Sequence, residues 1–329
     1  MRKLITAFLY AALIVFAAPY AAAETDAQWK PNAFNTLAKC RPLWIALGDV
    51  PTDRNATGRD TTFVCHPRFA LSHDNVSKTP DWVLEKLTRT QVSGSVNRPN
   101  KKFTSDKRVP PRGRAEDKDY PPKAVGLARG HMAPSEDFNN SVVAMKDTFV
   151  LSNAVPQVAS FNGGIWGRFE RRVRHIAVER KTVHVITGPV RRTGNAVSVT
   201  VPSENACGRE ISLKGPDIIQ VCRAHNENRN VKCSRGVGVP IAVFKIVFDS
   251  AKDEVYAFVM PNNVHDRGGD DELTYLNKFR VPVATIEKMT GLQFFRQLPE
   301  QRQQKLLNAC ENNNLWAPEP KVKKKKKPA

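Results

Sequence analysis

Residues 161–174 read Phe-Asn-Gly-Gly-Ile-Trp-Gly-Arg-Phe-Glu-Arg-Arg-Val-Arg and begin a stretch with clear helical periodicity. Large apolar side chains recur there every three or four positions, which predicts a helix over residues 163–179. A set of residues spaced by four lies on one slowly turning ridge of this helix, namely Asn162, Trp166, Glu170 and Arg174. Each has an ordinary explanation when taken alone, because an Asn can cap a helix, a Trp can pack in a core and a Glu–Arg pair can lie at the surface.

Apolar runs elsewhere in the chain predict a sheet that packs against this helix. Strands are expected to begin near residue 62 and to cover 147–151, 181–187, 240–249 and 254–260. Residues 81–89 fit either a strand or a short helix, and further helices are expected over 283–291 and 299–309. An extended arm is expected over 24–66 and a long loop over 91–123. Strands mixed with few helices predict an α+β protein whose central, mainly antiparallel sheet is flanked by helices.

A second polar motif precedes the helix, at residues 127–137, and reads Leu-Ala-Arg-Gly-His-Met-Ala-Pro-Ser-Glu-Asp. A neutral imidazole such as that of His131 is the commonest side chain for accepting a proton near neutral pH. The guanidinium of Arg129, two residues earlier, is suited to holding a phosphate. A lone His is nevertheless more often structural than catalytic, so this motif gains weight only together with the helix.

Together the two motifs resemble the DNA/RNA non-specific endonuclease family, the ββα-metal nucleases. The family signature is Asp-Arg-Gly-His followed by a helix with Asn-x-x-x-Trp-x-x-x-Glu, and the matching stretches here are residues 128–134 and 152–174. Similar segments at 82–84, 183–189, 239–245 and 279–292 extend the resemblance over residues 60–298. The resemblance implies the ββα-metal nuclease fold and hydrolysis of phosphodiester bonds in DNA and RNA with little regard for sequence.

The resemblance also implies a role for each matching residue. His131 would be the general base that activates the attacking water. Asn162 would be the direct protein ligand of one Mg²⁺, with Mn²⁺ as an alternative, and the remaining positions would be filled mostly by water. Glu170 would hold one of the metal-bound waters.

On the substrate side, the resemblance implies that Arg129 and Arg174 bind the phosphate and stabilise the transition state. Asn153 would support the substrate site through hydrogen bonds, and Lys78 would be the family's basic residue four positions before a Trp. Two departures stand out. The family's first signature residue is Asp, whereas this chain has Ala128, and Lys78 replaces the usual Arg and so loses bidentate geometry.

The amino terminus and the charge bear on location and partners. Residues 1–23 have the basic start, apolar run and small-residue end of a cleavable signal peptide, which predicts a secreted or periplasmic protein with no stable membrane insertion after cleavage. We expect a nuclease domain over 24–311, with a probable insertion at 190–238, and a disordered Lys-rich tail over 312–329. The net charge of +19 favours nucleic acid or an anionic membrane as partner, although such an excess can also serve solubility alone.

Six cysteines in an exported chain favour disulfides, and Cys40 with Cys65 is the pair we expect. At least two of Cys207, Cys222 and Cys233 are expected to pair with one another. A zinc site that adds His225 is the alternative, although the short paired knuckles of structural zinc sites are absent from the sequence.

The sequence therefore predicts a secreted or periplasmic, sugar-non-specific endonuclease with a His general base and one Mg²⁺. The alternative is a catalytically weak or inactive exported nucleic-acid-binding protein on the same scaffold, which Ala128 favours. A third interpretation is a disulfide-rich surface protein whose Lys tail docks on anionic envelopes. The long loop carries basic residues that either grip substrate or are simply solvated: Arg98, Lys101, Lys102, Lys107, Arg108, Arg112 and Arg114.

Overall fold

The computed structural model describes residues 37–54, 57–120, 125–191, 198–216 and 236–310. Its centre is a seven-stranded sheet in the order β12-β11-β10-β7-β4-β3-β2, in which every neighbouring pair is antiparallel. The strands are β2 (Thr61–Cys65), β3 (Phe69–Asp74), β4 (Thr79–Thr88), β7 (Thr182–Val190), β10 (Ala242–Asp249), β11 (Glu254–Pro261) and β12 (Arg280–Val281). The α+β class and the mainly antiparallel sheet that the sequence predicted are confirmed.

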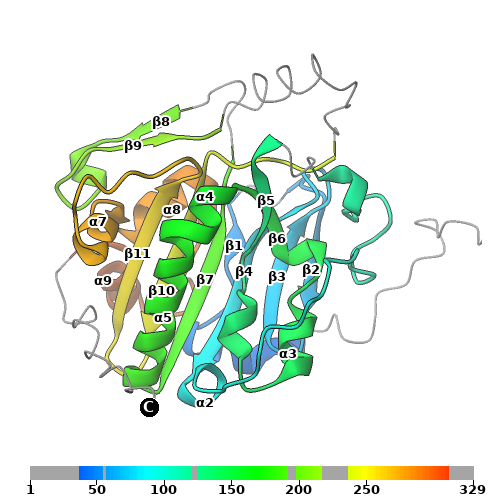
Figure 1. Cartoon of the computed structure of the whole chain (residues 1–329). Helices are drawn as coiled ribbons and strands as arrows, with labels where there is room; N and C mark the ends of the chain where they lie inside the picture. The colour runs from blue at the N-terminus through cyan, green and yellow to red at the C-terminus, as the bar shows by residue number, and fades with distance from the viewer. Residues whose placement is uncertain (1–36, 55–56, 121–124, 192–197, 217–235, 311–329) are drawn as a thin grey trace, which may run out of the picture.

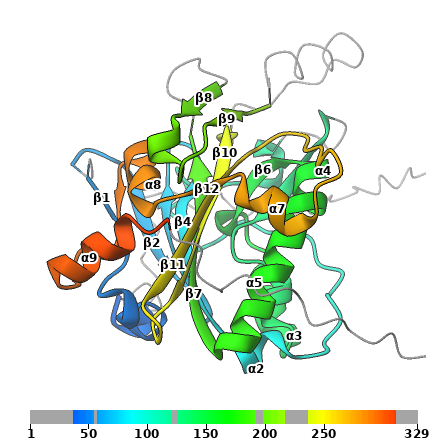
Figure 2. The same cartoon turned by 90° about the vertical axis from the view of Figure 1, so that its left-hand side faces the viewer.

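Helices cover both faces of the sheet (Figures 1 and 2). One face carries α3 (Val142–Asp147), α5 (Gly167–Arg180) and α7 (Glu272–Asn277), and the other carries α8 (Val283–Thr290) and α9 (Glu300–Leu307). Alternate residues of β7 enter the two cores, since Val185 packs on the α5 side and Ile186 on the α8 side. Burial on both faces explains why the central strands are continuous apolar runs.

The remaining described elements are short. Three separate two-stranded sheets are β1 (Thr52–Asp53) with β13 (Leu292–Gln293), β5 (Leu127–His131) with β6 (Ala154–Val158), and β8 (Ser198–Val201) with β9 (Ile211–Lys214). The helical turns are α1 (Leu37–Cys40), η1 (Arg41–Leu43), η2 (Ile45–Leu47), α2 (Arg89–Val92), η3 (Asp117–Asp119), η5 (Ser135–Phe138), η6 (Leu151–Asn153), α4 (Ala159–Phe161), η7 (Asn162–Trp166) and η8 (Ser203–Asn205). Strand β6 leads directly into α4, η7 and α5, so the β5–β6 pair and the long helix form one unit (Figure 1).

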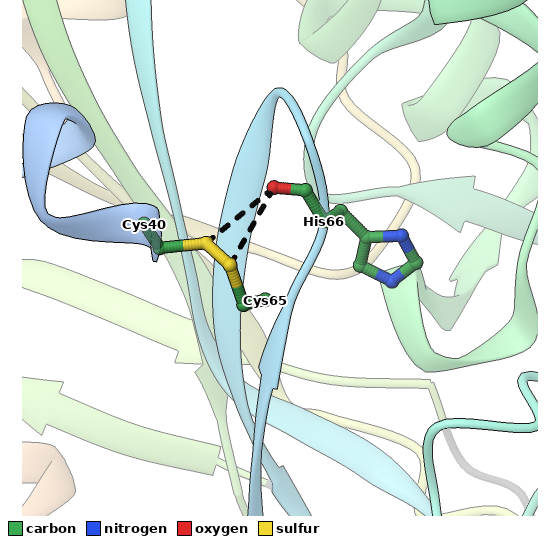
Figure 3. The surroundings of a disulfide bond; sticks show 3 residues. All are labelled: Cys40, Cys65 and His66. Carbon is green, nitrogen blue, oxygen red and sulfur yellow. Dashed lines mark hydrogen bonds between the residues drawn. A yellow bond between two sulfur atoms is a disulfide. The ribbon is translucent and has the colours of Figure 1, made fainter. Parts of the chain in front are cut away.

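Two disulfides join distant parts of the described chain. Cys40 pairs with Cys65, as predicted, and the backbone oxygen of His66 lies 3.5 Å and 4.0 Å from their two sulfurs (Figure 3). Cys207 pairs with Cys310, a bond that the sequence did not predict. Cys222, Cys233 and His225 lie outside the described residues.

The structure corrects two local predictions. The strand expected at 147–151 is wrong: α3, which Ser141 caps, runs to Asp147, and only Val150 forms a single bridge, to Thr104. The apolar side chains of this stretch are buried although they belong to a loop. Buried apolar residues give the same sequence pattern in a loop as in a strand, so the pattern could not distinguish the two. The extended arm expected over 24–66 is also wrong in part, because residues 37–47 form helical turns.

Residues 81–89, which fitted either a strand or a helix, lie mostly in the ten-residue strand β4. Among the described helices, none combines the length and the apolar composition that crossing a membrane requires. The expected leader and the Lys-rich tail lie outside the described residues. Of the expected insertion, β8, η8 and β9 are described, and most of its other residues are not.

Candidate active site

His131 ends β5, where it pairs with Ala154 of β6. Its ring lies between two aromatic side chains, with ring centroids 4.5 Å from Phe103 and 4.9 Å from Phe149. The residue is only 7% exposed, and its Nε2 has no hydrogen-bond partner among the described residues. Buried polar atoms are usually paired, so the unpaired imidazole nitrogen leaves His131 free to act on another group.

Burial, reinforced by the positive charge of Arg98, lowers the pKa of His131 to about 3. The guanidinium of Arg98 lies over the ring of Phe149, 5.3 Å from its centroid, and Phe149 in turn contacts the imidazole. His131 is therefore neutral throughout the physiological pH range, which is the form that accepts a proton.

The low pKa of His131 predicts an acid-sensitive fold. Its pKa is about 3 when folded and 6.5 as the ordinary value, so below pH 6.5 protonation favours the unfolded chain, and stability present above that pH is lost on acidification. For this group alone, going from pH 7 to pH 4 should cost about 3 kcal/mol of unfolding free energy. Urea unfolding of the wild type and of His131→Leu at both pH values would measure this; equal pH dependence in the two proteins would contradict the buried neutral histidine.

The backbone around His131 is held by close packing and by buried hydrogen bonds. A β-carbon at Gly130 would overlap the buried side chain of Gln157 on β6, so a larger residue there would require Gln157 to move. Asn153 is fully buried, and its amide exchanges hydrogen bonds of 2.9 Å and 3.0 Å with the backbone of Ala133 while also donating to Thr148. Asn153 thus fixes the segment that follows His131, and both of its donor hydrogens are already used.

The helix of the second motif begins irregularly. Residues Asn162–Trp166 form a π-helical turn, η7, and Gly164 departs from helical geometry with φ −96° and ψ −114°. The regular ridge that the spacing predicted is therefore interrupted between Asn162 and Trp166. Asn162 is partly exposed and its amide bonds to no other described residue, whereas Trp166 is fully buried. Single π turns inside helices occur often at functional sites.

Glu170 lies about one turn beyond Trp166 and Arg174 about two turns beyond it, and both side chains are half-buried. Burial raises the pKa of Glu170 to about 7, with Asp137 adding to the effect and Lys245, Arg174 and Arg98 opposing it. Arg174 Nη1 donates to Asp137 Oδ1 at 2.8 Å, which joins the helix to η5, the turn that follows His131. Arg98 acts electrostatically on both Glu170 and His131, so the two predicted catalytic groups share one neighbourhood.

A basic groove adjoins His131. It encloses about 830 Å³ and is lined by Arg98, Lys101, Lys102 and Arg129 as well as by the two rings that contact His131, those of Phe103 and Phe149. Arg98 was not among the predicted site residues, and the only signal for it in the sequence was its place in the basic loop.

Arg129 of this groove is the predicted phosphate ligand beside His131. Its guanidinium pairs with the exposed Asp117 at 2.6 Å and lies over the ring of Tyr120. Ala128, at the position where the family has Asp, also lines the groove. Asp117 therefore supplies a carboxylate to Arg129 from another element, although an exposed ion pair of this kind is weak.

Lys78 stands apart from this cluster. It lies at the turn before β4 with a positive φ of 53°, and its ammonium is 3.0 Å from Asp119 of η3. Other basic residues of the long loop likewise have partners within the protein, some of them at its surface: Arg108 with Asp106, Arg112 with Asp60, and Arg114 with the carbonyl of Val109. The loop thus divides into a groove-lining part and a part whose basic side chains are paired within the loop or with Asp60, next to β2.

The donor set fits a magnesium ion. The amide oxygen of Asn162 is a hard oxygen ligand of the kind that Mg²⁺ prefers, Mg²⁺ commonly keeps several of its waters, and the carboxylate of Glu170 can accept hydrogen bonds from such a water. Within the described residues there is no group of three or more His, Cys, Asp and Glu side chains arranged to hold a metal. A mostly hydrated Mg²⁺ bound through one amide requires no such group.

Comparisons with known proteins identify the family of the chain. The family model described as DNA/RNA non-specific endonuclease matches residues 48–301. The human mitochondrial nuclease EXOG is 32% identical over 252 residues, which cover 75% of this chain but only 60% of that protein. A nuclease of Syncephalastrum racemosum is 32% identical over 308 residues, covering 89% of this chain and 85% of that protein.

A solved structure is similar in fold as well as in sequence. It is the crystal structure of the EndoG/EndoGI complex, which concerns the mechanism of EndoG inhibition. Its similar chain is 25% identical, with a TM-score of 0.57, and the match covers 80% of this chain and 94% of that chain.

The comparisons correct the predicted location. Relatives from human, yeast and nematode are named as mitochondrial nucleases, so the secreted or periplasmic location expected from residues 1–23 is wrong. A basic start and an apolar run show that a segment has the composition of a leader, but receptors read the address, and composition alone does not determine the compartment.

Proposed function

Because the chain belongs to the DNA/RNA non-specific endonuclease family, we propose that it is a metal-dependent endonuclease that hydrolyses phosphodiester bonds of DNA and RNA with little regard for sequence. One observation supports this most strongly: a buried, neutral imidazole with an unpaired Nε2 packs against two aromatic rings that line a groove of basic side chains. A general base beside cationic phosphate ligands is the arrangement that phosphodiester hydrolysis requires.

In this proposal each residue acts at a defined place. His131 Nε2 takes the proton of the attacking water, and its low pKa keeps it ready to do so. Arg129 and Arg98 bind the phosphate from the groove, while Arg174, held by Asp137, stabilises the charge that develops on it. Asn162 would hold Mg²⁺ and Glu170 one of its bound waters, and the metal supplies Lewis-acid stabilisation of the phosphate and of the leaving oxygen when bound.

Two residues have supporting roles on the substrate side. Asn153 supports the segment that carries His131, through its bonds to Ala133. Lys78 would contribute to substrate binding only if its ion pair with Asp119 opens.

The experiment that tests this function is digestion of supercoiled plasmid and of RNA by the purified protein, with Mg²⁺ and with EDTA. Cutting of both that stops in EDTA is the expected result, and it would show that Ala128 is tolerated. The alternative, an inactive binding protein on the same scaffold, is favoured by Ala128 at the family's Asp position. No cutting, with the plasmid still retarded in a gel, would establish that alternative.

Binding of nucleic acid without sequence preference should depend strongly on salt concentration. Lysines that neutralise phosphates release counterions when the protein binds. The plot of log association constant against log salt concentration therefore has a negative slope, whose magnitude decreases by about 0.9 for each phosphate that is no longer neutralised. Lys101→Ala/Lys102→Ala should therefore reduce the slope by about 1.8 and weaken binding about equally for unrelated sequences. Filter binding in EDTA over a series of NaCl concentrations measures this, with Lys252→Ala, in the β10–β11 turn, as control. An unchanged slope would place the substrate elsewhere.

A further inference from the structure

On the sheet face beneath α5, which is largely apolar, three buried polar side chains are neighbours. Val183, Val185, Val243 and Val247 belong to the core on this side. Glu85 of β4, Thr187 of β7 and Lys245 of β10 interrupt it, and each is only 1% exposed. Lys245 is the direct cross-strand partner of Thr187, and Glu85 pairs with Val185 two residues along β7. Side chains two residues apart share a face, so the three polar groups lie together.

Lys245 is the costliest of the three to bury. Its Nζ donates to Thr187 Oγ1 at 2.6 Å and lies 5.1 Å from the centroid of the Trp166 ring. One hydroxyl and one aromatic face replace only part of the hydration of an ammonium, and a buried charge with so few partners destabilises a fold. Trp166 belongs to η7, the turn that begins at Asn162, so the ammonium contacts the base of the site helix directly.

The charge of Lys245 also reaches the carboxyls above it. It favours the ionised forms of both Glu85 and Glu170. Burial raises the pKa of Glu85 well above its ordinary value, and the neighbouring carboxyl of Asp137 adds to this effect. Asp137 in turn accepts the hydrogen bond of Arg174. The electrostatic effect of Lys245 on Glu85 and Glu170, together with the hydrogen bond from Arg174 to Asp137, therefore links the sheet to the two site residues of α5.

We propose that Lys245 is a positioning residue of the nuclease site, which fixes η7 and the start of α5 through Trp166 and draws the carboxylate of Glu170 into its working position. The inference rests on the proposed function, because it assigns Lys245 to the reaction of Glu170 and Asn162. Lys245 itself contacts neither the groove nor His131 in any described interaction.

The competing explanation is that Lys245 only balances Glu85 inside the core. The two explanations predict different effects on the reaction when Lys245 is replaced by an apolar residue. Methionine has nearly the length and volume of lysine, and apolar replacement of buried charges is often neutral or stabilising for the fold. If the role is merely structural, removing both charges together should leave the reaction intact.

The test compares Lys245→Met, the double variant Glu85→Gln/Lys245→Met, and Lys252→Met as the matched control from the exposed turn of the same hairpin. For Lys245→Met we expect kcat to fall by about 10- to 100-fold, as is common when a group supporting a metal ligand is lost. KM, the Kd for DNA in EDTA and the thermal unfolding midpoint should stay close to wild type. The double variant should be equally impaired, and Lys252→Met should be unaffected.

A second readout is independent of cutting. Direct titration of Mn²⁺, followed by its electron paramagnetic resonance signal, should show about tenfold weaker binding to Lys245→Met than to the wild type. If Lys245→Met does not fold, Thr187→Val removes only the hydroxyl that receives the ammonium and should show the same two effects at smaller size.

The outcomes separate the two proposals. Wild-type kcat in the double variant would reduce Lys245 to a charge balance for Glu85 and overturn the inference. Equal Mn²⁺ affinity in Lys245→Met and the wild type would also overturn it, whether or not the wild type cuts nucleic acid. A wild type that binds Mn²⁺ but cuts neither DNA nor RNA would overturn the proposed function instead.

Discussion

Replacing His131 with alanine is expected to lower kcat for plasmid cleavage by about 10²- to 10⁴-fold, the usual contribution of a positioned general base. The imidazole is neutral at assay pH because burial holds its pKa near 3, and its Nε2 is engaged by no other described residue. Without it, no described side chain in the aromatic slot between Phe103 and Phe149 can take the proton of the attacking water. Initial rates at saturating Mg²⁺ and substrate measure the effect.

Two controls make the His131 result specific. The Kd for DNA in EDTA should stay within a few-fold of wild type, because phosphate binding is assigned to Arg98 and Arg129 rather than to the imidazole. His175→Ala, on the same helix as Glu170 but outside the proposed site, should retain full activity. Substantial turnover by His131→Ala would show that another group is the base, and the mechanism would have to be abandoned.

Replacing Asn162 with alanine is expected to raise the Mg²⁺ concentration for half-maximal activity by about 10- to 100-fold. Asn162 is partly exposed at the start of the π turn, and its amide bonds to no other described residue, so a metal is the partner that it fits best. Activity over a Mg²⁺ titration and direct Mn²⁺ binding would both report the loss. Asn162→Asp, which keeps an oxygen ligand and adds charge, should bind the metal at least as tightly as the wild type.

The Asn162 result has a clear contrary outcome. If Asn162→Ala loses turnover at every Mg²⁺ concentration while its metal affinity is unchanged, then Asn162 contacts the substrate and not the metal. Unfolding in urea at pH 7 should be nearly the same in all three proteins, because an exposed amide without hydrogen bonds contributes little to stability.

Much of the fold could be predicted because its signals are local. The helix around Glu170 and the strands near 181–187, 240–249 and 254–260 follow from the spacing of their apolar residues, and the structure confirms them. The same reasoning failed at 147–151, since Phe149 and Val150 are buried without belonging to a strand. It also missed the π turn at Asn162, because apolar spacing does not show where one extra residue enters a helical turn.

The sequence by itself determined which residues are candidates for chemistry. The order and spacing of His131, Asn162 and Glu170 were enough to identify the family and to predict a metal-dependent nuclease. The pairing of Cys40 with Cys65 also followed from proximity in the chain, whereas Cys207 pairs with Cys310 across 103 residues and could not be found that way.

Only the tertiary structure decided the surroundings of those candidate residues. It packs His131 between two rings and so depresses its pKa, brings Arg98 from a distant loop to the same place, and puts Lys245 under the helix that carries Glu170. The physical reason is that burial and charge act through space. The pKa of a side chain depends on how much water and which charges surround it, and those neighbours come from strands and loops that are far apart in the chain.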